Sequence, residues 1–208
     1  MRLTTKTLLA TAALAAVPMM ANAESQFTTG TGTPITAQAR LDFLINVPKI
    51  LFLRVGAGGA DFTNNGTINQ IAFDVPAASI GAGVVAATPG SGDLLNGAVT
   101  AKVIGNNGNI TLSSATLGAL SNGAAGDSIS YAQINTAVAT LTSTPALPHP
   151  TLADGATTSV LLTPATGKLI NRDARWTYTY ANAAVVAPGA YGGVNSNNSR
   201  VTYTASMP

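Results

Sequence analysis

The chain has 208 residues, of which only 9% are charged and none is cysteine. The absence of cysteine excludes disulfide bonds, thiol catalysis, thiolate metal sites and a lipid-modified amino-terminal cysteine. The formal net charge is only +2 at pH 7, which gives no basic patch for nucleic acid or for an anionic membrane.

The first 23 residues have the three-part plan of a secretory signal peptide. Arg2 and Lys6 form a basic start, residues 8–20 are apolar, and Ala21-Asn22-Ala23 is a small-residue cleavage site. The apolar stretch is shorter than the roughly 20 residues that a membrane span requires. We therefore expect export and cleavage after Ala23, which leaves eight basic against eight acidic side chains.

The mature chain would begin with a leader, followed by the clearest periodic signal in the sequence. Residues 24–36 are rich in Thr and Gly and predict a flexible leader. Apolar and polar residues then alternate over residues 37–47, which predicts a half-buried strand. Pro48 interrupts this alternation, and a more fully apolar strand is expected over residues 50–55.

The next predicted strands are separated by turn residues. Alternating apolar residues predict strands over 71–75 and 99–103, and a return strand begins at Ile110. The residues between the last two, 106–109, contain an Asn-Gly step, which is the strongest short-range signal of a β-hairpin. We therefore expect a hairpin at this position.

The middle of the chain is less regular. Residues 116–120 and 131–138 are each compatible with a short helix or a strand. Three prolines within residues 144–150 predict an extended loop, because proline fixes φ and lacks an N–H group. A further strand is expected at residues 160–162.

Two alternating runs close the chain, at residues 176–180 and 201–205. In total we expect eight or nine short strands, which is typical of an all-β immunoglobulin-like or jelly-roll sandwich. The predicted organisation is a signal peptide over 1–23, a leader over 24–36 and a single β-sandwich domain over 37–208.

The inventory of catalytic side chains is poor. The single histidine, His149, lies between two prolines without an evident nucleophile, so we interpret it as an exposed loop residue. The chain has no EF-hand loop and no phosphate-binding glycine motif. Asp61, Asp93 and Asp127 could contribute to a calcium site, although loop aspartates more often cap turns. We expect no metal site and no cofactor, and the protein is predicted not to be an enzyme.

An aromatic row on the penultimate strand has two interpretations. Trp176, Tyr178 and Tyr180 lie on the same face of that strand. An exposed row could stack on sugars, whereas large side chains at alternating positions normally face the core. We favour the core, and sugar contact stays an alternative.

Three features together resemble cysteine-free fimbrial subunits of the chaperone–usher kind and related bacterial surface β-sandwich proteins. The first is a signal peptide and leader that run into an alternating strand at residues 34–41. The second is a Pro-Gly-Ala-Tyr-Gly-Gly turn at 188–193 before the alternating terminal residues 200–205. The third is the absence of cysteine.

This resemblance implies self-association by β-strand addition, in which the leader of one subunit fills an incomplete sandwich of the next. The donor would be residues 26–38, and the alternative is a leader that is merely disordered. The partners would be other subunits, a periplasmic chaperone and an outer-membrane usher. The residues implied in strand exchange are Phe27, Ile35, Ala37, Val201 and Tyr203.

The sequence thus favours a non-enzymatic structural or adhesive subunit of a bacterial surface fibre. We expect it in the periplasm, at the cell surface or outside the cell of a diderm bacterium. The alternative is a secreted monomeric module that binds glycans or a protein.

Overall fold

The computed structural model describes residues 24–123 and 127–208. The chain divides into two units, one ending at Val47 and a compact one from Pro48 to Pro208. The predicted signal peptide lies outside the described residues. The compact unit begins eleven positions later than residue 37, where the predicted sandwich domain started.

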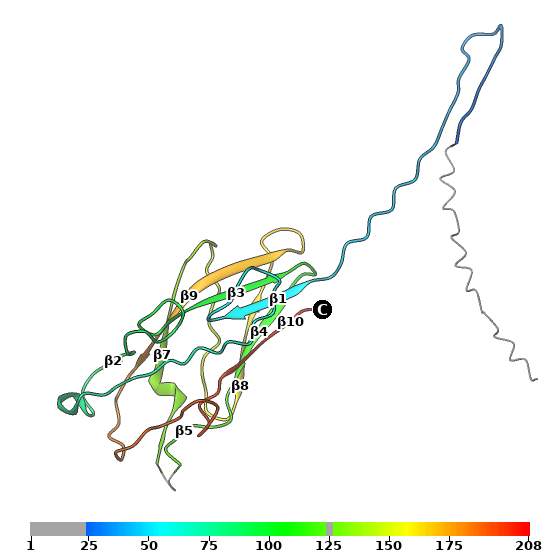
Figure 1. Cartoon of the computed structure of the whole chain (residues 1–208). Coiled ribbons are helices and arrows are strands. Elements are labelled where there is room, and N and C mark those ends of the chain that lie inside the picture. Colours follow the sequence, from blue (N-terminus) through cyan, green and yellow to red (C-terminus); the bar gives the residue numbers. More distant parts are fainter. Residues whose placement is uncertain (1–23, 124–126) are drawn as a thin grey trace, which may run out of the picture. The chain divides into compact units, whose positions relative to one another are not determined.

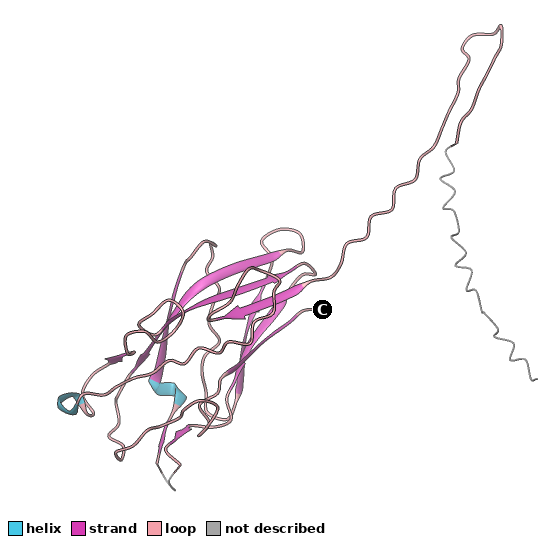
Figure 2. Ribbon diagram, viewed as in Figure 1, coloured by secondary structure: helices cyan, strands magenta, loops and turns pink. Residues whose placement is uncertain are grey.

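The compact unit is built from β-strands (Figures 1 and 2). The described residues contain ten strands and two single-turn 3-10 helices, η1 (Ala77–Ser79) and η2 (Tyr131–Gln133). Strands account for 29% of these residues, and all strand pairs are antiparallel. The predicted all-β class is confirmed, with a strand count close to the expected eight or nine.

Five strands form the larger sheet. The long strand β9 (Ile170–Tyr180) pairs along one edge with β3 (Ala98–Gly105), which pairs in turn with β1 (Leu51–Val55). The other pairings of β9 are with β2 (Val85–Ala86) and β7 (Ile134–Ala139). β1 is therefore an edge strand of this sheet.

Three strands form the smaller sheet. Its central strand β4 (Ile110–Ala115) lies between β10 (Thr202–Ser206) and β8 (Thr157–Leu162). A separate short pair joins β5 (Leu120–Ser121) to β6 (Ser128–Ile129). The last strand of the chain, β10, thus forms an edge of the smaller sheet.

The hydrophobic core lies between these two sheets. Alternate residues of each strand point inward, so that each sheet buries one face against the other. Trp176 on β9 is completely buried, as its alternation with threonines predicts. The fully buried side chains of the core come from both sheets: Val103, Ala174 and Trp176 from the larger one, and Ile110, Leu112 and Leu162 from the smaller one.

The Asn-Gly turn at residues 106–109 joins two different sheets, so the predicted hairpin was wrong. It connects β3 of the larger sheet to β4 of the smaller one, and these strands do not pair. Across the core, the inward side chains of β3 and β4 face each other, whereas in a shared sheet they would lie side by side on one layer. The side chain of Asn106 also accepts from the Ile50 amide at 2.9 Å and donates to the Pro48 carbonyl at 2.8 Å. The turn therefore holds the residues that lead into β1.

Two further strand predictions differ from the structure. Residues 71–75 and 37–47 both lack strand pairing. Ile71 and Phe73 nevertheless pack against the core, and a single backbone bond from Thr88 to Ala72 replaces a ladder. Period-two alternation indicates that one face of a segment is apolar. It does not indicate that a neighbouring strand is available for pairing.

The two ambiguous segments resolve differently. Residues 131–138 begin as η2 and continue as β7. The Ser130 side chain caps η2 by accepting from the Ala132 amide. Residues 116–119 form neither a helix nor a strand before β5 begins at Leu120.

The proline-rich segment forms the expected loop and closes one side of the sandwich. The Leu147 amide donates to the Asp173 carbonyl of the larger sheet at 3.0 Å. Beyond the prolines, the Thr151 carbonyl accepts from the Thr158 hydroxyl of β8 in the smaller sheet. Leu147 is completely buried between the sheets. The loop thus bridges the two layers and seals the core on this side.

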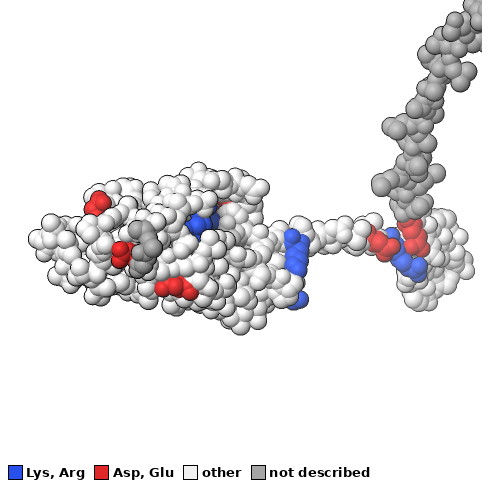
Figure 3. All heavy atoms as spheres, turned by 90° about the horizontal axis from the view of Figure 1, so that it is seen from below, with Lys and Arg blue, Asp and Glu red and all other residues white. Residues whose placement is uncertain are grey.

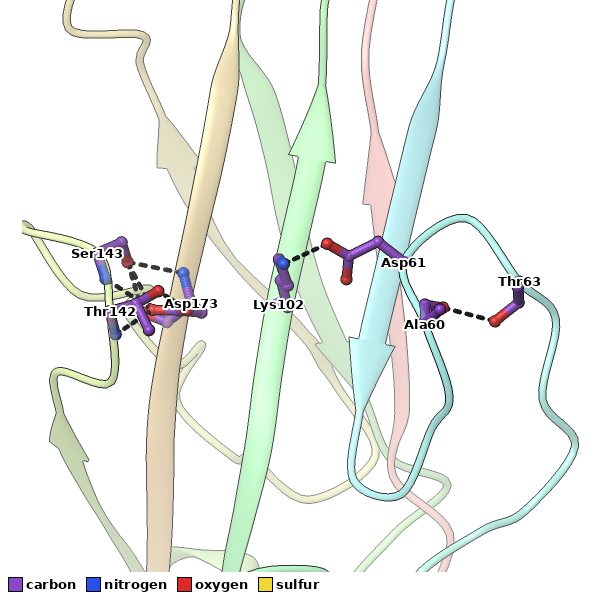
Figure 4. A network of polar contacts seen from close by, with 7 residues as sticks. All are labelled: Ala60, Asp61, Thr63, Lys102, Thr142, Ser143 and Asp173. Carbon is purple, nitrogen blue, oxygen red and sulfur yellow. Dashed lines mark hydrogen bonds and ion pairs between the residues drawn. The ribbon is translucent and has the colours of Figure 1, made fainter.

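Charged side chains on the outer face of the larger sheet have local partners (Figure 4). Lys102 on β3 forms an ion pair with Asp61. Asp173 on β9 accepts hydrogen bonds from the amides and hydroxyls of Thr142 and Ser143. Burial alone would raise the pKa of Asp173, but these hydrogen bonds outweigh it and lower the pKa to about 2.

Candidate functional site

An exposed apolar segment over residues 37–47 immediately precedes the compact unit. Leu41, Phe43, Ile45 and Val47 are between 74% and 83% exposed. In extended backbone these alternate residues share one face, while Gln38, Arg40, Asp42 and Asn46 fall on the other. Figure 2 draws the segment as a loop without strand partners. It has the pattern of a half-buried strand, but its apolar face is not covered.

Such exposure is costly in water. Burial of one Leu, Ile or Phe side chain stabilises a protein by about 1.5–3 kcal/mol. A contiguous apolar surface of this kind usually marks a site of interaction. The segment is therefore the leading candidate for a functional surface.

The leader that precedes it folds back on itself. The Gln38 amide donates to the Gln26 side-chain oxygen at 3.0 Å, and the Thr28 hydroxyl donates to the Thr36 carbonyl at 3.2 Å. Residues 34–47, in contrast, contain no bend. The straight stretch that presents an apolar face thus begins near the end of the predicted donor, residues 26–38.

The compact unit has two neighbouring edge strands with unused backbone groups. β10 pairs with β4 alone, and β1 pairs with β3 alone. In the part of the chain that the structure describes, no other backbone segment bonds to the second edge of either strand. β1 and β10 lie close together where the two sheets meet (Figure 1).

Partly buried apolar side chains lie along these two strands. We define the β1–β10 seam as the partly buried apolar side chains of β1, of β10 with the residue that follows it, and of the unpaired residues 71–73. All of them pack against the core without being fully buried: Leu53, Val55, Ile71, Phe73, Tyr203, Ala205 and Met207. The seam thus combines partly buried apolar side chains with two strand edges that have no backbone partner among the described residues.

The residues predicted for strand exchange fall in two places. Phe27, Ile35 and Ala37 are exposed in the first unit. Val201 directly precedes β10, and Tyr203 lies within it; both are half-buried. The structure therefore places Tyr203 in the seam, Val201 just before β10, and the other three in the segment before the compact unit.

His149 is half-buried and packs against the aromatic core, so its interpretation as an exposed loop residue was wrong. Its Nε2 atom lies 2.7 Å from the Tyr203 hydroxyl and 3.2 Å from the Tyr178 hydroxyl, which are themselves 3.0 Å apart. The imidazole ring also meets Trp176 edge-on, with ring centroids 4.6 Å apart. Burial lowers the pKa of His149 to about 4, and a hydrogen bond with the Pro150 backbone opposes this shift. The apolar residues around it in the loop, such as Leu147, were the sequence signal of burial.

The aromatic row on β9 does not form an exposed platform. Trp176, Tyr178 and Tyr180 are all buried. The Trp176 indole N–H donates to the Leu147 carbonyl at 2.9 Å, which satisfies its one polar atom inside the core. Burial raises the pKa of Tyr178 to about 12. These residues belong to the core, as favoured from the alternation.

Features of other site classes are weak in the described chain. Asp61 and Asp93 engage Lys102 and Arg54, and no cluster of three metal-ligating side chains occurs among residues 24–123 and 127–208. A pocket of about 90 Å³ beside β1 is well below the roughly 300–1,000 Å³ of typical ligand sites. A second pocket of about 430 Å³ falls within that range but is open to solvent, and its lining includes no charged side chain: Asn109, Thr111, Leu161, Ser206, Met207 and Pro208. The same residues contain no helix long and apolar enough to cross a membrane.

The surface carries little charge. On the face that Figure 3 shows, acidic and basic side chains are few and scattered among uncharged residues. Long-range electrostatic steering of a charged partner is therefore not a feature of this face. Recognition through apolar contacts and backbone hydrogen bonds suits such a surface better.

Comparisons with protein-family models, with curated proteins and with solved structures find no match to this chain.

Proposed function

We propose that the protein is a non-enzymatic structural subunit of a bacterial surface fibre, which self-associates by β-strand addition. Residues 37–47 of one copy pair with β10 of the next and cover its β1–β10 seam. The observation that carries this proposal is the exposed, alternating apolar face of residues 37–47. Export to the surface follows from the predicted signal peptide, and adhesion is a function that such a fibre could carry.

The two surfaces have complementary chemistry. The segment offers an apolar face and an unpaired backbone, and the seam offers partly buried apolar side chains beside an unpaired strand edge. β10 is five residues long, which matches the span from Leu41 to Ile45. Strand addition would pair backbone groups and bury alternate side chains at once.

Pairing between copies is favoured over pairing within one copy. Only Pro48, Lys49 and Ile50 separate Val47 from the start of β1. The Asn106 side chain accepts from the Ile50 amide and donates to the Pro48 carbonyl, which ties these residues to the turn between β3 and β4. A tight reversal over residues 47–50 would need the Ile50 amide for its own closing hydrogen bond, so it would break this contact.

The first test compares two substitutions on opposite faces of the segment. Phe43→Asp places a charge on the apolar face, whereas Leu44→Asp is the matched control, because Leu44 is 86% exposed on the other face. We expect the mature chain from Glu24 and its Leu44→Asp variant to form oligomers or fibres in size-exclusion chromatography and negative-stain microscopy. The Phe43→Asp variant should be monomeric.

A second measurement covers the case in which assembly needs a helper protein. A labelled peptide of residues 36–47 should bind the monomeric Phe43→Asp chain in fluorescence anisotropy, and the peptide with Phe43→Asp should not. Equal behaviour of the two peptides, together with monomers throughout, would contradict strand addition. That result would favour the alternative of a monomeric binding module.

A further inference from the structure

The side chain of His149 links three parts of the compact unit. It lies in the proline loop and contacts Tyr178 on β9 of the larger sheet and Tyr203 on β10 of the smaller sheet. Tyr178 and Tyr203 also contact each other, which completes a triangle of hydrogen-bonding groups between the layers. Within this triangle, Tyr203 is the β10 side chain that ties the strand to the larger sheet.

We propose that the His149 imidazole is an acid-sensitive latch, which holds β10 against β9 while it is neutral and loosens the strand when it is protonated. A neutral ring accepts at Nε2 from a tyrosine hydroxyl. A protonated ring can only donate there, so that the tyrosine hydroxyl that donated to Nε2 must turn its proton elsewhere. The added charge would also be enclosed by aromatic rings.

The surroundings of His149 offer no compensating negative charge. The ionisable groups that face it are the phenols of Tyr178 and Tyr203, and beyond them Tyr131 acts on Tyr203. The rest of the loop, residues 144–152, has no charged side chain. Among the described residues no carboxylate forms an ion pair with His149. Protonation would therefore place an unpaired charge on a half-buried ring among aromatic side chains, which is unfavourable.

The direction of the pH effect follows from linkage. The pKa of His149 is about 4 in the folded chain and 6.5 in the unfolded chain, so the unfolded chain binds more protons between these values. The stabilisation is complete above pH 6.5 and declines as the pH falls toward 4. At pH 5 this one group should lower the folding equilibrium constant by about 30-fold relative to pH 7.5.

The latch rests on the contacts among His149, Tyr178 and Tyr203, and only its consequence for assembly rests on the proposed function. Because β10 supplies one wall of the β1–β10 seam, loosening it would weaken the site at which the next copy pairs. Acid would then disfavour growth of the fibre. At neutral pH, β10 would stay packed against β9 and the seam would keep its structure.

The test uses the mature chain with Phe43→Asp, so that self-association does not enter. His149 is the single histidine of the sequence, so its proton resonance can be followed without ambiguity in an NMR titration. We expect a titration midpoint near 4. A midpoint at the ordinary value of about 6.5 would overturn the proposal.

Urea unfolding at pH 7.5 and pH 5 measures the linked stability. The folding equilibrium constant should fall about 30-fold in the parent chain and much less in His149→Gln, which keeps a polar atom near Nε2 but does not titrate. An equal loss in both chains would refute the latch. The test does not depend on fibre formation, so its failure is distinguishable from failure of the proposed function.

Hydrogen exchange locates the effect. After correction for intrinsic rates, amides of β10 should lose protection at pH 5 before those of β3 and β4, and this early loss should disappear in Tyr203→Phe. Uniform loss across the compact unit would show that His149 affects global stability alone and would overturn the latch on β10.

Discussion

Asp173 shows how one carboxylate can organise a loop. It lies on the outer face of β9, 7% exposed, and accepts from two amides and two hydroxyls of Thr142 and Ser143 (Figure 4). These bonds stabilise the ionised form and hold the start of the segment that leads into the proline loop. The loop is thus anchored at Asp173 before it crosses the core at Leu147.

Replacement of Asp173 by Asn should destabilise the compact unit by about 1–3 kcal/mol at pH 7, because an amide group would face N–H donors. The pKa of Asp173 falls from 3.8 to about 2 on folding, so its stabilisation is present above pH 3.8 and is lost as the pH falls through 2. Urea unfolding should therefore show a gap between wild type and variant that narrows from pH 5 to pH 3. Asp74→Asn, at an exposed position, should show little change at any pH.

Apolar neighbours such as Leu147 were a sequence signal that His149 packs inward, but the flanking prolines outweighed it. Flanking prolines indicate a loop, and a loop is usually at the surface. The structure departs from this rule because the loop bonds to β9 through the Leu147 amide and places the Leu147 side chain in the core. The distant partners, Tyr178 and Tyr203, become neighbours only through the fold.

Strand prediction succeeded where a strand has paired neighbours. β3 and β10 fall on segments whose alternation was evident, as does the second half of β9, residues 176–180. β8 contains the strand that was expected over residues 160–162. Strand prediction failed over residues 71–75, which have the same alternation but only one backbone bond to another segment. Alternation depends on the side chains on the two faces of a segment. Strand pairing depends on the backbone groups at its two edges and on which segments lie beside them. The sequence shows the faces directly, but it does not show which segments lie at the edges.

The same reasoning applies to the candidate site. The resemblance implied a donor segment before the sandwich and placed it at residues 26–38. The structure shows the fold-back of that leader and the uncovered face of residues 37–47. The alternation from Ala37 was visible, but it was interpreted as a strand inside the domain.

Two turn glycines allow a matched test of element connections. Gly108 has a φ of 94°, and an added Cβ would meet nothing within 4 Å. Gly97 has a φ of 76°, and an added Cβ would lie 2.4 Å from Ala87 Cβ and 3.0 Å from the Tyr178 carbonyl. Gly108→Ala should cost about 1–2 kcal/mol from backbone strain alone. Gly97→Ala should cost clearly more, because strain and a clash add, and equal costs in urea unfolding would contradict this geometry.

At the level of the whole molecule, the proposal treats the compact unit as a sandwich that lacks a covering strand. A rearranged chain tests this idea: residues 37–47 are removed from their native place and joined after Pro208 through a short flexible linker. The appended segment could then turn back along β10, so we expect a monomer with a higher Tm than the chain simply lacking residues 37–47. The same rearrangement with Phe43→Asp should give little or no gain. A similar Tm for both rearranged chains would argue against the seam as the acceptor.

The order of strands along the chain has a consequence for the time that folding takes. β4 pairs with β10 through contacts such as Ala115 with Thr202, and β3 pairs with β9 through contacts such as Ala98 with Thr177. Because strands so distant in sequence must meet, the contact order is high and folding of such topologies is slow. During that delay, the edge of β4 that pairs with β10 is still open, and the apolar residues 37–47 are already accessible. A newly synthesised chain would therefore be most prone to wrong association before β10 pairs with β4, and rapid binding of a correct partner would protect it.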